Sequence, residues 1–570
     1  MRIDTLLLSE IEVFPELFLG ISIVYLVLHC TFLSIKNNYV LIQSSVVFLG
    51  SLVIFLSFCL LLNDSLVVLG LNSFNNTIIN DYLSFTAKGF TAILSLFCLL
   101  IIKNYLLSQK FNNFEYVLLI LFSVLGLFLL CSSNDLITAY LAIELQSLSF
   151  YVLAAFKKNS SFSVDAGVKY FIVGALSSSL FLFGSSLLYC NTGTVCFSDY
   201  KDLFDNYFFL EFESISHFNT KNFIRSLYWE FNLKNYDDAK MFLELCGLQN
   251  SEFIDEMGLL SIYMRETMFY SYLKFELVPF FDSQNLDLIK FGLILILISL
   301  FLKLAIAPFH TWSPDVYENS PSPSTFLFSV VPKFVVFVLL IRIFYLSFNS
   351  FIDSWRYFIV VVVVLTVIVG SFGGLEQRKL KSLLIYSSIG HMGYSLISFS
   401  VGTFESMQIL LSYLLIYGFS GLCVWTIFIS MRIKTNYFQK QNKDLTDLVS
   451  LSKSNNTLAL IFSIVLFSVA GFPPMIGFLV KISVFLSAIE SFMFFVPLIC
   501  ILCSVVSTFY YIRIVKILFF EKTVAGKLFY PINYFNSISI SLFFYFFIFL
   551  FVNPTLLFLF SYKLSLLTML

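Results

Sequence analysis

Long apolar runs recur along the whole 570-residue chain, and they constrain its fold more than any other feature. A helix needs about 20 apolar residues to cross the hydrocarbon of a bilayer, where its backbone must satisfy its own hydrogen bonds. About fourteen runs are long enough, and the chain is 59% hydrophobic and only 12% charged. The predicted fold class is therefore an all-α polytopic membrane protein with spans at 10–32, 40–62, 83–103, 116–132, 135–155, 168–190, 289–309, 324–346, 356–373, 382–400, 405–430, 457–485, 492–515 and 535–560.

Charged residues inside these runs are the second constraint. Inserting a charged side chain at the bilayer centre costs roughly 2.5 to 3.5 kcal/mol even on lenient insertion scales. Several such charges in one chain therefore indicate a functional role. Lys303, Lys333 and Lys481 each lie in otherwise apolar sequence. Lys169 and Glu144 have similar neighbours. The pattern predicts that the protein moves charge across the membrane.

Signatures of bound cofactors are missing from the sequence. It contains no GxGxxG after a strand, no GxxxxGK[ST] loop and no cysteine-rich cluster motif. Among ten cysteines only Cys500 and Cys503 are close, and they lie in an apolar helical run where packing is far commoner than redox or metal chemistry. We therefore expect no flavin, iron–sulfur cluster, nucleotide or metal on this chain, and no nucleic-acid partner.

Basic residues in the predicted loops indicate the orientation. Lys and Arg fall in the first, third, fifth, ninth, eleventh and thirteenth connections, whereas the even-numbered connections are nearly free of them apart from the sixth. Because basic loops stay on the cytoplasmic or matrix side, both termini are expected on the opposite face.

The sixth connection, residues 196–288, is predicted to be an acidic extramembrane insert on the same side as the termini. The stretch 196–290 has sixteen acidic and eight basic residues. Part of it has the amphipathic pattern of a helix. A solvated loop and a contact with another subunit are both open interpretations of this insert.

Prolines interrupt two of the predicted spans close to a lysine. Pro308 follows Lys303 by five residues, and the string GFPP at 471–474 precedes Lys481. Proline removes a backbone hydrogen bond and tends to break a helix, and paired interrupted helices are typical of repeat-built transporters. A simple kink is the alternative at either site taken alone.

Several strings together resemble one family: NDLITAYLAIELQSLSFYVLAA, DAGVKYFIVGALSSSLFLFGSSLLY, KLAIAPFHTWSPDVYENSPSPSTFLFSVVPKF, LKSLLIYSSIGHMGYSL and GFPPMIGFLVKISVF. They are similar to NADH dehydrogenase subunit 2, an antiporter-like membrane subunit of respiratory complex I. The resemblance covers roughly residues 12 to 515 without the insert. It implies two inverted five-helix repeats with discontinuous helices 7 and 12, arranged as an N-terminal three-helix segment (1–112), a first repeat (113–195 and 289–346), the insert (196–288), a second repeat (347–515) and a C-terminal helix (516–570).

The same resemblance implies a function. It suggests a proton-translocating subunit of NADH:ubiquinone oxidoreductase, driven by redox chemistry on other subunits, which hold the FMN, the iron–sulfur clusters and the ubiquinone of the complex. The expected partners are other membrane subunits, especially subunits 4L and 4, together with lipids, protons and water. The 72 Phe and 30 Tyr are typical of an A/T-biased organellar genome, which favours the mitochondrial inner membrane with the termini and insert on the intermembrane-space side.

The charged residues suggest how protons would move. Burial favours the neutral form of a lysine and a nearby carboxylate favours its charged form, so moving one partner loads or releases a proton. We expect Glu144 to pair with Lys303, Lys333 to relay the proton and Lys481 to gate its exit. The resemblance assigns these positions to the proton path. His391 is a candidate relay between Lys333 and Lys481, with ordinary helix packing as the alternative.

Lys169 is expected near Glu144 and Lys303, although a side chain that extends to the membrane surface is the alternative.

Two other functions stay open for the chain as a whole. One is a subunit of a multi-subunit cation/proton antiporter. The other is a structural membrane scaffold, whose buried charges only fix the register of its helices.

Overall fold

The computed structural model describes residues 13–34, 39–62, 71–108, 113–204, 283–434, 439–441, 444–449, 451–521 and 529–569. The chain divides into two compact units, one made of Met1–Tyr200 with Lys290–Leu570 and the other of Lys201–Ile289. Most of the predicted insert, including its amphipathic stretch, lies outside the described residues.

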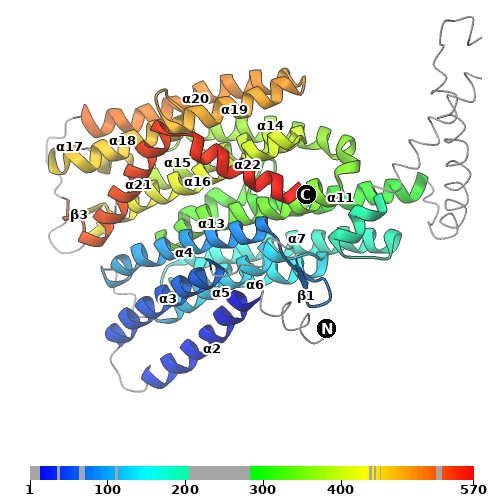
Figure 1. The fold of residues 1–570 in the computed structure, drawn as a ribbon. Helices are drawn as coiled ribbons and strands as arrows, with labels where there is room; N and C mark the ends of the chain where they lie inside the picture. The colour runs from blue at the N-terminus through cyan, green and yellow to red at the C-terminus, as the bar shows by residue number, and fades with distance from the viewer. Residues whose placement is uncertain are drawn as a thin grey trace, which may run out of the picture. The chain divides into compact units, whose positions relative to one another are not determined.

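Helices make up most of the described residues of the larger unit (Figure 1). Each of the fourteen predicted runs coincides with a helix or with an interrupted pair of helices, and eleven of the described helices are long and apolar enough to cross a membrane. The predicted all-α membrane fold is confirmed. The helices are α2 (Phe14–Ser34), α3 (Tyr39–Leu62), α4 (Tyr82–Ser108), α5 (Glu115–Ser132), α6 (Leu136–Ala154), α7 (Ser161–Thr192), α11 (Ser283–Leu304), α12 (Trp312–Asn319), α13 (Ser322–Leu340), α14 (Ile352–Leu375), α15 (Leu380–Val401), α16 (Phe404–Ser430), α17 (Leu451–Ser454), α18 (Asn456–Ala470), α19 (Ile476–Glu490), α20 (Phe495–Phe519), α21 (Tyr534–Val552) and α22 (Thr555–Met569).

Within the described residues, two short antiparallel hairpins lie between helices. β1 (Leu71–Ser73) pairs with β2 (Ile78–Asn80), and β3 (Arg432–Lys434) pairs with β4 (Gln439–Gln441). The first hairpin leads directly into α4, so its last residue and Asp81 are held at the start of that helix.

Two spans are interrupted where the prolines predict. Between α11 and α12 the backbone passes through Ala305, which has a φ of 57°, and between α18 and α19 it passes through Gly471, with a φ of 86°. A left-handed residue ends a helix and leaves its last carbonyl groups without intrahelical partners. The discontinuous helices 7 and 12 are therefore present as the pairs α11–α12 and α18–α19.

The C-terminal region differs from the single helix predicted over 516–570. After the end of α20 at Phe519, its described residues form two helices, α21 and α22, separated at Asn553 and Pro554. Proline lacks a backbone N–H and disfavours helical geometry in the residue before it, and Asn553 accordingly has a φ of −130° and a ψ of 71°. α22, drawn in red in Figure 1, packs against α16 and α4.

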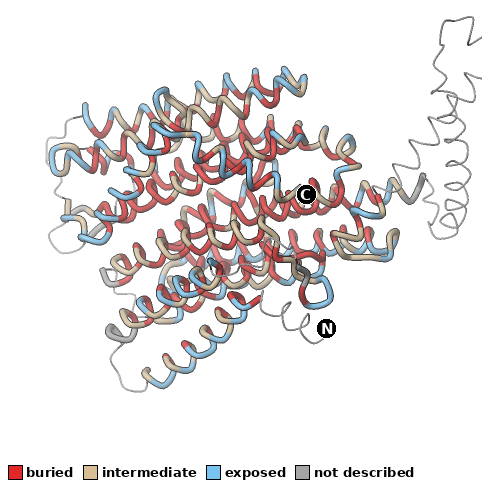
Figure 2. Tube along the Cα trace, in the orientation of Figure 1, coloured by how far each residue is buried: buried red, intermediate tan, exposed pale blue. Residues whose placement is uncertain are grey.

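Burial identifies α13 and α15 as central helices of the larger unit. Every residue of α13 except Pro332 is buried, and so is every residue of α15 except Tyr386. Helices such as α2 and α20 instead alternate between buried and exposed faces (Figure 2). The two central helices carry Lys333 and His391, so both side chains are enclosed by other helices.

Candidate functional site

Lys333 lies in the middle of α13, and its side chain is only 3% exposed. Its Nζ donates to Ser388 Oγ on α15 at 2.9 Å and lies 3.5 Å from Tyr417 Oη on α16. The Tyr417 hydroxyl donates in turn to the carbonyl of Ser329, 3.1 Å away on α13. A buried amine needs such partners, since desolvating it without them is costly. The head group of Lys333 is thus held by neutral hydroxyls where three helices meet.

Lys481 lies on α19 and reaches back across the second helix break. Its Nζ donates to the carbonyl oxygens of Val469 at 3.0 Å and Ala470 at 2.8 Å, the last two residues of α18. The C-terminal end of a helix carries partial negative charge and unpaired carbonyl groups, so it favours an ammonium. The break therefore supplies the polar partners of Lys481, which is 6% exposed.

His391 lies between these two lysines. Its Nδ1 is 2.7 Å from Tyr413 Oη. Two small cavities of about 10 and 20 Å³ are lined by both His391 and Lys481, and the larger one is also lined by Tyr417. A polar cavity needs roughly 10 to 15 Å³ to hold one water. Lys333, Tyr417, His391 and Lys481 are therefore parts of one buried polar group, which we call the central group.

Lys303 and Glu144 form a separate polar group beside the first helix break. The Lys303 Nζ is buried and has no hydrogen-bond partner within the described residues, and it lines a cavity of about 10 Å³ together with Ser177. Glu144 on α6 is within electrostatic range of Lys303. Among the described residues no direct hydrogen bond joins this group to Lys333.

The ion pair predicted between Glu144 and Lys303 is not formed in this structure, although the two side chains lie within electrostatic range of each other. The two groups form no ion pair, and Glu144 instead accepts a hydrogen bond from Ser147 Oγ at 3.4 Å, one turn along its own helix. Sequence spacing shows which helix carries a charge. It does not determine the helix rotation and side-chain rotamer that bring two head groups within 4 Å.

Lys169, which was expected near Glu144 and Lys303, forms an ion pair with Asp315. Its Nζ is 2.6 Å from Asp315 Oδ2 on α12, and both side chains are about half exposed. Glu318, also on α12, pairs with Lys379 at the start of α15, and Lys381 donates to the carbonyl of Ser320 at 2.6 Å. Lysines from α7 and α15 therefore hold the short helix α12 after the first break, and Lys169 belongs to this contact.

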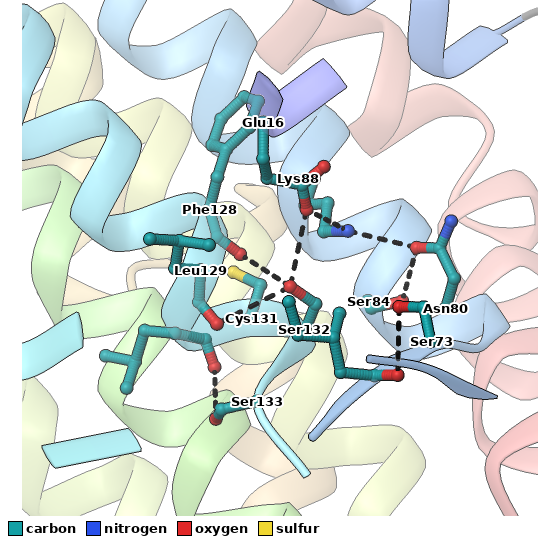
Figure 3. A network of polar contacts seen from close by, with 12 residues as sticks. Glu16, Ser73, Asn80, Ser84, Lys88, Phe128, Leu129, Cys131, Ser132 and Ser133 are labelled. Carbon is teal, nitrogen blue, oxygen red and sulfur yellow. Dashed lines mark hydrogen bonds and ion pairs between the residues drawn. The ribbon is translucent and has the colours of Figure 1, made fainter. Parts of the chain in front are cut away.

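Another pair of buried charges was not among the residues predicted from the sequence. Lys88 on α4 is 0% exposed and forms an ion pair with Glu16 on α2, which is 4% exposed (Figure 3). Arg342, just after α13, forms a second ion pair with Asp81 at 2.6 Å. The criterion that selected Lys303, a lone charge inside an apolar run, also applies to Lys88 in the string TAKGFTAILSLF.

Comparison with known proteins identifies the family. The family model described as "NADH:quinone oxidoreductase/Mrp antiporter, TM" matches residues 133–233 and 249–508. NADH-quinone oxidoreductase subunit N of Paramagnetospirillum magneticum is 32% identical over 465 residues, which cover 82% of this chain and 80% of that protein. NADH-ubiquinone oxidoreductase chain 2 of Marchantia polymorpha is 32% identical over 493 residues, which cover 86% of this chain and 85% of that protein.

Solved structures share the fold. A chain of respiratory complex I from Thermus thermophilus superposes with a TM-score of 0.68 at 22% identity, covering 95% of this chain and 98% of that one. A chain of the Mrp complex from a Dietzia species gives a TM-score of 0.69 at 15% identity, covering 97% of both chains. Since the family model matches more than half of the sequence and the named relatives align over most of its length, the chain belongs to the NADH:quinone oxidoreductase/Mrp antiporter family of membrane proteins.

Proposed function

We propose that this chain is the antiporter-like, proton-translocating subunit 2 of a respiratory complex I. Its relatives are named as subunit N or chain 2 of NADH-quinone or NADH-ubiquinone oxidoreductases, and the two described above align over at least four-fifths of their own length. In this proposal the chain is a translocase subunit, while the FMN, iron–sulfur clusters and ubiquinone chemistry belong to other subunits. Its partners are complex I membrane subunits, with subunits 4L and 4 as the expected neighbours.

The proposed location is the mitochondrial inner membrane, with the termini and the insert facing the intermembrane space. The basic odd-numbered loops and the Phe- and Tyr-rich composition support it. The proposed repeats are 113–195 with 289–346, and 347–515, and each would contain one of the two interrupted helices.

The central group carries the proposal for proton movement. A proton that leaves Lys333 passes to the Tyr417 hydroxyl and the adjoining cavity, and from there to His391 and Lys481. Hydroxyl groups and imidazole both accept and donate hydrogen bonds, so each can take a proton from one side and give one to the other. The carbonyl groups at the end of α18 hold the Lys481 head group beside the cavity shared with His391, which makes Lys481 a holding point before exit.

Glu144 and Lys303 lie within electrostatic range but form no ion pair, which supports a role for this pair of residues in driving proton movement. Two unit charges 4 Å apart at an effective dielectric constant of 20 interact by about 4 kcal/mol. Moving one charge against 100 mV requires about 2.3 kcal/mol. Making or breaking a single Glu144–Lys303 contact is therefore large enough to change whether Lys303 holds its proton. We propose that partner subunits drive this change.

Substituting Lys333→Met in the assembled complex tests the proposal. Methionine keeps an unbranched side chain but cannot carry a proton, so we expect normal assembly and a several-fold loss of proton pumping. The measurement is proton translocation by the purified complex in sealed vesicles, together with NADH oxidation. Lys453→Met, at an exposed lysine of α17, is the control and should pump normally. Normal pumping by Lys333→Met would instead support the scaffold interpretation.

A further inference from the structure

The N-terminal segment contains a buried charge cluster that the proposed path does not use. Glu16 Oε1 accepts from the Lys88 ammonium and from Ser132 Oγ, the latter at 3.3 Å. Lys88 Nζ also donates to Asn80 Oδ1 at 3.0 Å, and Ser84 Oγ donates to the same oxygen at 3.3 Å (Figure 3). The groups come from α2, α4, α5 and the hairpin before α4, so four separate segments converge on one ion pair.

The second ion pair belongs to the same cluster. Arg342 Nη2 donates to Asp81 Oδ1 at 2.6 Å, and its Nε donates to the carbonyl of Cys131 at 3.2 Å. The Cys131 thiol is within electrostatic range of all four charged side chains, Glu16, Asp81, Lys88 and Arg342. Two acids and two bases therefore share one region with no formal net charge; three of them are buried, and Asp81 is 21% exposed.

The cluster is joined to the helix that carries Lys333. Phe90, two residues after Lys88, packs against Phe334 with ring centroids 4.6 Å apart. Arg342 lies nine residues after Lys333, or about 13 Å along the helix axis at 1.5 Å per residue. It sits in a π-helical stretch, Ile341–Ser347, a form that often marks functional positions. The cluster therefore contacts the helix of Lys333 at two places, through Phe90 at Phe334 and through Arg342 in the π-helical continuation of α13.

Stability alone is a weak reason to keep such a cluster. Replacing a buried ion pair by apolar residues of similar volume is often neutral or stabilising, because desolvation offsets the attraction. One oxygen of Glu16, Oε2, is buried and has no hydrogen-bond partner within the described residues. A proton can therefore be placed on Oε2 without breaking a hydrogen bond of Glu16.

We propose that Glu16 and Lys88 form a further proton-transfer pair of this chain, placed between Lys333 and the membrane face at which α4 begins. In the transfer, an Nζ–H bond of the Lys88 ammonium breaks, an O–H bond forms on Glu16, and a neutral amine and carboxylic acid result. Glu16 then gives that proton to a water molecule on the side of the membrane face at which α4 begins, and the neutral Lys88 amine takes a proton from a hydronium ion on the side of Lys333, which restores the ion pair. This step rests on the proposed function, and it adds a second branch to the path.

The double variant Glu16→Gln/Lys88→Met tests the proposal without leaving an unpaired buried charge. We expect the complex to assemble at normal abundance and to pump several-fold fewer protons per NADH than the unmodified complex, measured in sealed vesicles. Lys88→Arg is the second variant, because arginine keeps the ion pair but does not release its proton in proteins. It should assemble and show the same loss. Lys103→Met, farther along α4, is the matched control and should pump normally.

The outcomes separate this proposal from the proposed function. Normal pumping by the double variant or by Lys88→Arg, alongside a loss in Lys333→Met, would overturn the Glu16–Lys88 transfer while leaving the central path in place. Failure of both cluster variants to assemble would also overturn it, since the pair would then be structural. Normal pumping by Lys333→Met would contradict the proposed function itself.

Discussion

At the scale of single residues, the hydroxyl of Tyr413 is the group whose removal tests the relay through His391. Tyr413→Phe removes the only partner seen for His391 Nδ1 among the described residues, at 2.7 Å. A typical hydrogen bond contributes about 1 kcal/mol, and a barrier raised by that amount slows a step roughly five-fold. We expect proton pumping to slow by about that factor. Tyr345→Phe is the matched control, because the buried hydroxyl of Tyr345 donates to the carbonyl of Phe399, away from the central group. Equal losses of pumping in the Tyr413→Phe and Tyr345→Phe complexes would show that the effect is only structural.

The charged side chains also show how much of the site the sequence could predict. Lys303, Lys333 and Lys481 stood out because each is a lone charge in apolar sequence, and the structure places all three inside the protein. Their partners were not predictable in the same way. Lys481 binds carbonyl groups exposed by a helix break, and Lys169 binds Asp315, 146 residues away. Such contacts depend on how each helix is rotated and on which backbone groups are exposed. A pattern of residue types along the sequence does not give either of these.

At the scale of elements, the break between α18 and α19 fixes the position of Lys481. A Cβ at Gly471 would lie 2.8 Å from Lys481 Cδ, and the residue has a φ of 86°. Gly471→Ala should therefore both strain the backbone by about 1 to 2 kcal/mol and displace the lysine. Gly193→Ala, at a φ of 75° with no atom within 4 Å of the added Cβ, has only the backbone strain. We expect both variants to lower the melting temperature of the complex, and only Gly471→Ala to reduce proton pumping. Equal pumping by the two variants would contradict the proposal that the helix break positions Lys481.

The same elements show why most of the fold could be read from the sequence. Hydrophobic runs located every span among the described residues, because a membrane helix must be long and apolar over its whole length, and prolines located both interrupted helices. The break at Pro554 was missed although it follows the same rule, since the apolar run continues through it without a neighbouring charge. Hydropathy marks the extent of an apolar segment and does not by itself show where that segment is divided.

At the scale of the whole molecule, every residue of the proposed path lies in the unit made of Met1–Tyr200 and Lys290–Leu570. We therefore expect replacement of residues 205–282 by a Gly/Ser linker to leave proton pumping unchanged. A flexible linker of about 20 residues has an end-to-end distance of roughly 25 Å, and a second variant of twice that length controls for strain at the junction. Complex abundance on native gels and proton pumping in vesicles are the measurements. If both linker lengths prevent assembly while the Lys453→Met complex assembles, the acidic insert must bind another subunit, because a solvated loop of either length would be dispensable.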